Sequence, residues 1–95
     1  MPTYNGSNTS DSINGSSDPD LINGNAGDDQ LSGGAGNDTI NGGFNKDTLR
    51  GEDGNDTIYG STGSDTVTGD LGDDEIHGGV GADSIDGGLG NDVID

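Results

Sequence analysis

One aspartate recurs at every ninth position of the chain without a break. The aspartates are Asp11, Asp20, Asp29, Asp38, Asp47, Asp56, Asp65, Asp74, Asp83 and Asp92. Carboxylates and main-chain carbonyl oxygens are the ligands that hard cations prefer in proteins. The spacing therefore predicts a row of cation sites to which each repeat contributes one carboxylate.

Two further residue types keep the same spacing. A glycine opens each repeat, at Gly6, Gly15, Gly24, Gly33, Gly42, Gly51, Gly60, Gly69, Gly78 and Gly87. An aliphatic residue follows each aspartate by two places, from Ile13 to Ile94. A fixed period of this kind is the signature of a stacked solenoid. We expect residues 1–5 to form an N-terminal half-repeat that acts as a cap, and residues 6–95 to form one domain of ten repeats.

The composition indicates that cations are needed for folding. Only 23% of the 95 residues are hydrophobic, and the formal net charge is −17. A single file of aliphatic side chains buries too little apolar surface to offset the entropy of ordering the chain. Cysteine is absent, so disulfides cannot stabilise the fold. Metal binding is the remaining source of stability.

The same composition argues against several kinds of function. Only Lys46 and Arg50 could contact phosphate groups, so nucleic acid binding is disfavoured. No stretch is apolar enough for a membrane span, and residues 1–6 lack the basic and apolar regions of a signal peptide. A thin solenoid has no deep pocket that excludes water, so we expect no enzyme.

Each repeat divides into a loop and a strand, and residues 33–41 are the best-formed copy. Position 4 is glycine in seven repeats, and Asn45 and Asp18 there are residue types that tolerate positive φ, so the position marks a left-handed turn. Positions 1 to 6 then form a tight loop that exposes its carbonyl oxygens. Positions 7 to 9 form a short strand whose middle side chain points inward.

A loop and a strand turn the chain by about half a circuit, so two repeats form one coil. Repeats n and n+2 then lie about 4.8 Å apart, the spacing of paired strands. Ten repeats give five coils and two small parallel sheets, one from the odd and one from the even repeats. Because the loops stack too, the aspartates form a column along each edge, and their mutual repulsion requires cations between them.

The nonapeptide resembles Gly-Gly-x-Gly-x-Asp-x-U-x, with U aliphatic, the calcium-binding repeat of the repeats-in-toxin (RTX) family. The resemblance covers residues 6–95. It implies an all-β, right-handed parallel β-roll solenoid with two short parallel sheets and about five coils of 18 residues. It also implies that Ca²⁺ lies between consecutive loops on the same side of the roll, and that neighbouring ions share each aspartate.

The resemblance implies a set of ligands for each edge of the roll. One ion column uses Asp29, Asp47, Asp65 and Asp83, and the other uses Asp38, Asp56, Asp74 and Asp92. Main-chain carbonyls of the loops complete the sites. At position 1 the donors are Gly24, Gly33, Gly42, Gly51, Gly60, Gly69, Gly78 and Gly87. At position 4 they are Gly27, Gly36, Asn45, Gly54, Gly63, Gly72, Gly81 and Gly90.

The first two loops depart from the pattern. Thr9 is β-branched where positive φ is wanted, and Asp18 precedes Pro19, which favours an extended conformation. The sites of Asp11 and Asp20 are therefore expected to be weak. Five loops on each edge leave four gaps, or eight Ca²⁺ at most, and discounting these two loops leaves six well-formed sites.

Position 2 carries a residue other than glycine in six repeats, including Glu52 and Asp70. If this position contributes only its carbonyl, the side chains face solvent. The alternative is that Glu52 and Asp70 add negative charge near an ion.

The two ends of the solenoid differ. Tyr4 stands nine residues before Ile13, so residues 3–5 form a half-repeat whose tyrosine covers one end of the core. The other end leaves apolar side chains and strand edges uncovered. These side chains are Ile85, Leu89, Val93 and Ile94. Either a C-terminal flank has been removed, or two rolls associate end to end through this coil.

The outer surface offers weaker signals. Two threonine pairs should stack on the sheets, Thr39 with Thr57 and Thr48 with Thr66. Threonine rows suggest ice binding, but rows of two are better explained as polar surface that favours strands. His77 has no histidine or cysteine partner at metal spacing and is interpreted as a surface residue.

Position 3 becomes apolar late in the chain, at Leu71, Val80 and Leu89. These side chains either form a contact patch or fold over the edge of the coil. We favour the second interpretation.

The resemblance implies a calcium-binding β-roll module of a secreted protein that uses type I secretion and folds on binding Ca²⁺ outside the cell. The alternative is a structural spacer, or a ligand- or ice-binding segment, of a large RTX adhesin. The parent protein could be a protease, a lipase, a toxin or an adhesin.

Overall fold

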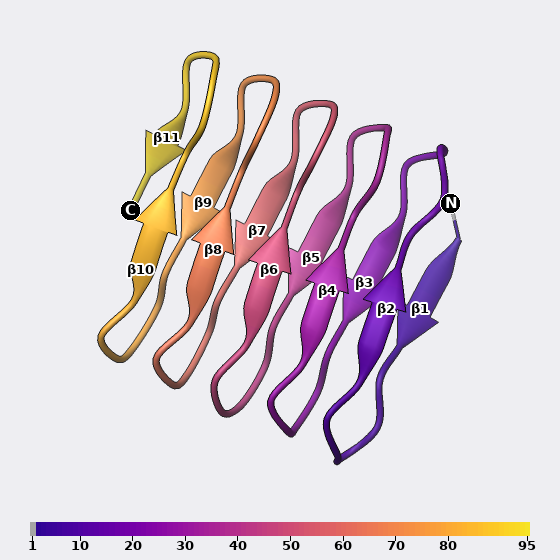
Figure 1. Cartoon of the computed structure of the whole chain (residues 1–95), viewed down its shortest axis with the longest axis vertical. Helices are drawn as coiled ribbons and strands as arrows, with labels where there is room; N and C mark the ends of the chain where they lie inside the picture. Colours follow the sequence, from indigo (N-terminus) through magenta and orange to yellow (C-terminus); the bar gives the residue numbers. More distant parts are fainter. Residues whose placement is uncertain (1) are drawn as a thin grey trace.

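The computed structural model describes residues 2–95, which form short strands joined by tight loops (Figure 1). The strands are β1 (Thr3–Asn5), β2 (Ser12–Asn14), β3 (Leu21–Asn23), β4 (Gln30–Ser32), β5 (Thr39–Asn41), β6 (Thr48–Arg50), β7 (Thr57–Tyr59), β8 (Thr66–Thr68), β9 (Glu75–His77), β10 (Ser84–Asp86) and β11 (Val93–Ile94). No helix in this part of the chain could cross a membrane. Each strand from β2 onward covers positions 7 to 9 of a repeat, or the first two of them in β11.

The strands form two parallel sheets, one on each face of a flat solenoid. One sheet has the order β1-β3-β5-β7-β9-β11 and the other β10-β8-β6-β4-β2. Each strand residue pairs with the residue two repeats away, as in Ile40 with Ile58 and Leu49 with Val67. The molecule measures 31 × 28 × 14 Å. The predicted all-β parallel solenoid of about five coils is confirmed.

The core is the predicted single file of aliphatic side chains. The fully buried members are Ile22, Leu31, Ile40, Leu49, Ile58, Val67 and Ile76. Each occupies the middle of its strand, while the flanking side chains are exposed or half-buried. Tyr4, Ile13 and Ile85 are partly buried against this file. A core only one side chain thick needs a further source of stability.

The two ends of the roll differ in how far their apolar side chains are covered. Tyr4 packs against the core at the end formed by β1. At the other end, the side chains of β11 remain open to solvent, with Val93 64% and Ile94 51% exposed.

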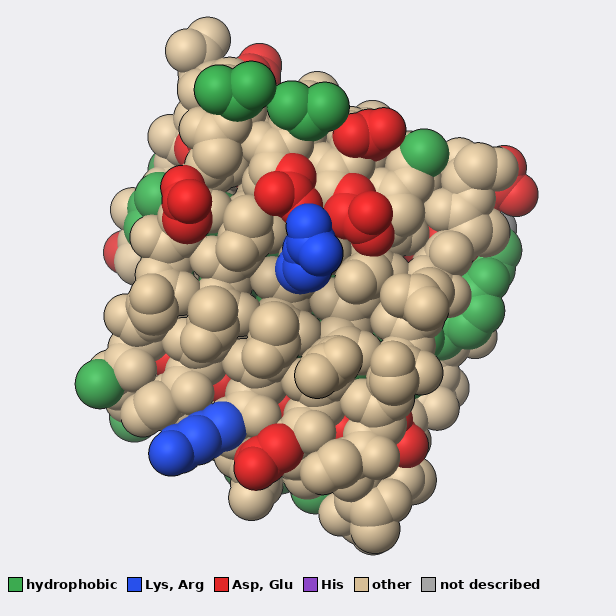
Figure 2. Space-filling model, viewed as in Figure 1, with side chains coloured by type: hydrophobic (Ala, Val, Ile, Leu, Met, Phe, Trp, Pro, Cys, Tyr) green, Lys and Arg blue, Asp and Glu red, His purple; other side chains and the backbone are tan. Residues whose placement is uncertain are grey.

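The face of the roll shown in Figure 2 is largely polar. The expected threonine pairs lie opposite each other, Thr39 with Thr57 and Thr48 with Thr66. The ring of His77 stacks on Tyr59 at 5.0 Å between centroids. His77 therefore lies on the surface, as expected, beside an aromatic neighbour that the spacing alone did not indicate.

The expectation that apolar side chains at position 3 fold over the coil edge is wrong. Leu71, Val80 and Leu89 are 49%, 73% and 70% exposed. The reason is backbone geometry: the N–H groups of these residues point to the preceding coil, as in Val80 to the carbonyl of Ser61 at 2.9 Å. The thin core is already covered by the loop backbone, so the side chains project outward.

Candidate metal centre

Position 4 of the loops is a left-handed turn, as predicted. The residues with positive φ there are Gly27, Gly36, Asn45, Gly54, Gly63, Gly72, Gly81 and Gly90. Thr9 and Asp18, the two residues expected to depart from the pattern, do not adopt this conformation. The first two loops are therefore built differently from the other eight.

Position 2 is a second left-handed position, which was not predicted. Its members with positive φ are Asn25, Gly34, Gly43, Glu52, Ser61, Asp70, Gly79 and Gly88. The signal was weak because Glu52 and Ser61 belong to types that rarely adopt this conformation, at a cost of about 1–2 kcal/mol each. Two left-handed residues in one loop turn the backbone so sharply that carbonyl groups face the neighbouring coil.

The aspartate columns are tied together by hydrogen bonds from coil to coil. The N–H of Asp38 donates to Oδ1 of Asp56 at 2.8 Å, and the N–H of Asp56 donates to Oδ1 of Asp74 at 2.9 Å. The same bond recurs from Asp11, whose N–H donates to Asp29, through to Asp92, which accepts from Asp74. One oxygen of each accepting aspartate is thus satisfied by the coil that precedes it.

The other carboxylate oxygen of the inner aspartates is buried and has no partner. These atoms are the Oδ2 oxygens of Asp29, Asp38, Asp47, Asp56, Asp65 and Asp74. The side chains are at most 2% exposed. A buried carboxylate oxygen without a hydrogen-bond donor destabilises the fold. The fold is stable only when a cation or a proton binds to that oxygen.

Each orphan oxygen faces a main-chain carbonyl across a small space. A Cβ placed on Gly42 would lie 2.8 Å from Oδ2 of Asp47 and 2.9 Å from the carbonyl oxygen of Gly60 in the next coil. At Gly60 the corresponding distances are 2.8 Å to Asp65 and 2.6 Å to Gly78. Two acceptors therefore converge where glycine leaves room, which is the arrangement that a hard cation stabilises.

The carbonyl groups at positions 1 and 4 accept no main-chain hydrogen bond in the described residues, although the carbonyl of Gly6 accepts the side-chain amide of Asn25 at 2.9 Å. In residues 2–95, the backbone hydrogen bonds of the loops end on carbonyls at positions 2, 6 and 9, such as those of Asn25, Asp38 and Asn41. None ends on a carbonyl at position 1 or 4. These are the two carbonyl sets expected from the sequence.

Side chains alone do not form a metal site in the described part of the chain. No three His, Cys, Asp or Glu side chains come together there. A metal ion bound in the loops would therefore need main-chain oxygens among its ligands. Such a donor set, made of oxygens only, fits Ca²⁺ and does not fit metals that prefer sulfur or imidazole.

The comparison with protein families agrees with this geometry. A model of the RTX calcium-binding nonapeptide repeat matches residues 5–40, 32–67, 41–75 and 59–94. The chain belongs to this family. It is thus an RTX calcium-binding β-roll module, and the repeat of this family is a structural calcium-binding repeat. The comparisons with curated proteins and with solved structures find no match.

The pKa values of the buried aspartates in the RTX roll rise from Asp38 to Asp56. Burial raises the pKa of Asp38 to about 6, of Asp47 to about 7 and of Asp56 to about 8. The charges of neighbouring aspartates in the same column contribute to these raised pKa values, and the N–H bond from the preceding coil opposes the shift. Burial also raises the pKa of Asp29, Asp65 and Asp74.

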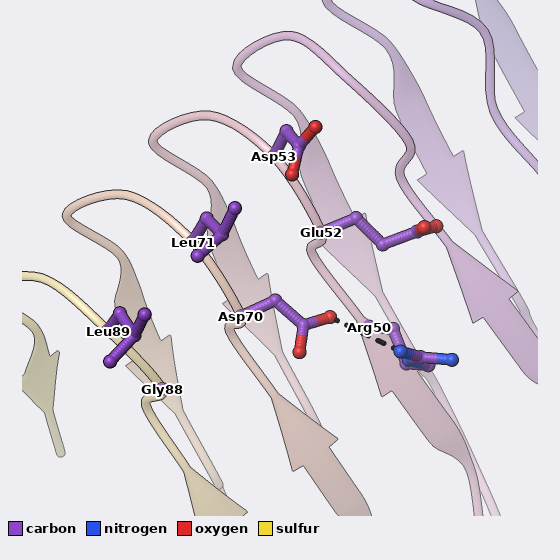
Figure 3. A pocket seen from close by; sticks show the side chains of 7 residues that line it. All are labelled: Arg50, Glu52, Asp53, Asp70, Leu71, Gly88 and Leu89. Carbon is purple, nitrogen blue, oxygen red and sulfur yellow. Dashed lines mark ion pairs between the residues drawn. The ribbon is translucent and has the colours of Figure 1, made fainter.

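Additional acidic side chains lie near the even column of the roll. The charge of Glu52 raises the pKa of Asp38, and that of Asp70 raises the pKa of Asp74. Glu52 and Asp70 line an open pocket of about 420 Å³ (Figure 3). Arg50 lies 3.6 Å from Asp70 within it. Both acidic side chains therefore act on the aspartate column, although their own carboxylates remain accessible to solvent.

The first two loops of the RTX roll satisfy their aspartates internally. Oδ2 of Asp20 accepts the N–H of Ser16 at 2.7 Å, and the Ser16 hydroxyl donates to both carboxylate oxygens. Ser7 makes the same three bonds to Asp11. Asp20 is as deeply buried as the inner aspartates, yet it has no orphan oxygen.

Proposed function

We propose that this chain is a calcium-triggered folding module of an exported protein. It stays unfolded where calcium is scarce and becomes an ordered roll outside the cell, where calcium is near the 10⁻⁴–10⁻³ M range to which extracellular modules respond. The proposal is supported by one observation above all, the six buried Oδ2 oxygens that lack a partner. Its cellular setting is supported by the family, whose members are typically secreted.

The proposed sites lie between successive loops on each edge. Each would take Oδ2 of the position-6 aspartates together with the carbonyls at positions 1 and 4. We propose six sites, between the loops of Asp29, Asp47, Asp65 and Asp83 on one edge and those of Asp38, Asp56, Asp74 and Asp92 on the other. Six Ca²⁺ carry twelve positive charges and would reduce the net charge from −17 to −5.

Calcium would act here by neutralising charge and by gathering oxygens. Without it, buried carboxylates in one column repel each other and face carbonyl oxygens. The apolar file is too thin to offset this cost together with the entropy of ordering the chain. Metal binding and folding are therefore expected to be one coupled process.

Circular dichroism tests the proposal directly. In chelator at pH 7.5 the spectrum should be that of an unfolded chain. Adding Ca²⁺ should produce the signal of β-structure with a sigmoidal dependence on concentration. Mg²⁺ is the control, because it requires small octahedral geometry and dehydrates reluctantly, so it should not induce the fold at equal concentration. A full β signal in chelator would contradict the proposal, and so would equal induction by Mg²⁺.

A further inference from the structure

The aspartates fall into two groups that satisfy the same oxygen in different ways. In loops three to eight, Oδ2 is buried and has no partner. In loops one and two, Oδ2 accepts a main-chain N–H at 2.6 Å from Ser7 and at 2.7 Å from Ser16. We propose that Ser7 and Ser16 replace a cation, so that the N-terminal coil of the folded roll closes without an ion of its own and the ion columns begin at Asp29 and Asp38.

The serine hydroxyl also supplies a bond that the column itself cannot give. Oδ1 of Asp38 accepts the N–H of Asp20, eighteen residues earlier. The residue eighteen places before Asp20 is Pro2, which has no N–H to donate. The Ser16 hydroxyl donates to Oδ1 of Asp20 at 2.9 Å instead. Both oxygens of this buried carboxylate are thus satisfied without metal.

Serine at position 2 does not cause this arrangement by itself. Ser61 occupies the same position in loop seven, but it has a φ of 73° and makes no hydrogen bond to Asp65. The difference lies at position 4. Loop seven has Gly63 with a φ of 99°, whereas loops one and two have Thr9 and Asp18, which do not adopt positive φ.

Position 4 thus selects between two loop forms, and serine completes one of them. In loops three to eight, which have glycine or asparagine at position 4, position 2 also turns left-handed and Oδ2 of the aspartate is buried without a partner. With Thr9 or Asp18, the serine N–H turns toward the carboxylate and closes the loop. This inference rests on the proposed calcium function, since it specifies which loops of the roll do without the ion.

The consequence is a coil at the indigo end of the folded roll that needs no calcium ion of its own (Figure 1). It carries Tyr4, which packs against the core. Its loops present the N–H groups of Asp11 and Asp20 to Asp29 and Asp38, the first members of the two ion columns. The closed coil therefore orients the first calcium-binding aspartate on each edge.

A matched pair of serine variants tests the role of the hydroxyl. Ser16→Ala removes bonds to Asp20, whereas Ser61→Ala removes a hydroxyl that makes no bond to its aspartate. In saturating Ca²⁺, Ser16→Ala should speed amide hydrogen exchange in residues 15–23 by about tenfold or more, as expected for a lost bond to a charged group. Ser61→Ala should leave exchange in residues 60–68 unchanged. Equal effects of the two variants would overturn the inference.

An exchange of loop sequences tests the ion count by calorimetry. The native chain should bind six Ca²⁺. Giving loop two the sequence of loop four, by Ser16→Gly, Ser17→Ala, Asp18→Gly and Pro19→Asn, should open the gap to loop four and raise the count to seven. The reverse exchange in loop four, by Gly34→Ser, Ala35→Ser, Gly36→Asp and Asn37→Pro, should close the gap to loop six and lower the count to five.

The outcomes separate the two proposals. A native chain that binds eight Ca²⁺, or counts that do not move with the loop exchange, would overturn the serine substitution while leaving the calcium function intact. A native chain that binds no Ca²⁺ would overturn both. If the exchanged chains do not fold, the pair of serine variants still decides the question.

Discussion

Each inner aspartate uses its two oxygens for different purposes. Oδ1 of Asp56 accepts the N–H of Asp38, which joins neighbouring coils, while Oδ2 is buried without a partner. A neutral amide would keep the first interaction and remove the charge that burial penalises. The same side chain therefore opposes folding without calcium and favours it with calcium.

The variant Asp56→Asn should separate these two effects. In chelator it should bring the chain closer to folding, because a buried charge next to Asp38 and Asp74 is lost. In a calcium titration it should need a concentration about tenfold higher, because neutral amides bind hard cations more weakly than carboxylates. Circular dichroism measures both. The control is Glu75→Gln on the exposed side of β9, which should change neither result by a comparable amount.

The glycine at position 1 leaves the space that a cation would use. In Gly42→Ala the new methyl group would lie 2.8 Å from Oδ2 of Asp47 and 2.9 Å from the carbonyl of Gly60, so it would occupy that space. We expect the calorimetric calcium count to fall by one and the folding midpoint to move to higher calcium. Ser64→Ala, at an exposed loop position, is the control. An unchanged count in Gly42→Ala would show that the ion does not bind in this space.

At the scale of the secondary-structure elements, the strands could be predicted from the sequence, whereas the loop conformation could be predicted only in part. An aliphatic residue between two polar ones at a fixed period determines where each strand lies and which side chain is buried. Position 4 was readable because glycine dominates it. Position 2 was not, because Glu52 and Ser61 adopt positive φ only when the stacked loops impose it. The outward direction of Leu71 depends on that same turn, so its exposure was predicted wrongly.

The burial of the aspartates could not be predicted from the sequence either. A carboxylate at the end of a loop is normally exposed. Here the loops of successive coils stack so closely that seven of these side chains are at most 2% exposed. The sequence predicted the column and its repulsion, and the structure adds the orphan oxygen that supports a metal site.

A comparison of central and terminal aspartates tests the column as a unit. Asp56 lies between Asp38 and Asp74 and would serve two sites, whereas Asp92 has a neighbour on one side only. Asp56→Ala should therefore lower the cooperativity of the calcium titration and raise its midpoint more than Asp92→Ala, because the two halves of the column must order separately. Sedimentation checks that both variants are monomeric. Equal effects in monomers would mean that the sites are independent.

At the scale of the whole molecule, protons should partly replace calcium. The pKa values of Asp38, Asp47 and Asp56 are raised to about 6, 7 and 8 in the fold, above the value of 3.8 for an unperturbed aspartate. A raised pKa in the folded state contributes stability at low pH that is lost as the pH rises through that value. The metal-free roll should therefore gain stability as the pH falls from about 8 toward 4.

Circular dichroism in chelator at pH 8, 6 and 5 measures this effect, with sedimentation to detect aggregation near the isoelectric point of about 4.1. In calcium the direction reverses, because protons compete for the carboxylates, so the folding midpoint should move to higher calcium as the pH falls. A chelated chain that is equally unfolded at pH 8 and pH 5 would show that the buried carboxylates do not control folding.

Because each strand residue pairs with the residue eighteen places away, the structural period of the roll is two repeats and not one. Inserting or removing eighteen residues keeps each edge and each face matched to itself, so the roll can change in length without changing its contacts. Inserting or removing nine keeps the aspartates in line but exchanges the two faces. Asn23, which now donates to Asn5, and Asn37, which accepts from Asn55, would then meet different neighbours. A roll of this kind therefore tolerates the insertion or removal of whole coils. The insertion or removal of half a coil disrupts side-chain contacts on its surface.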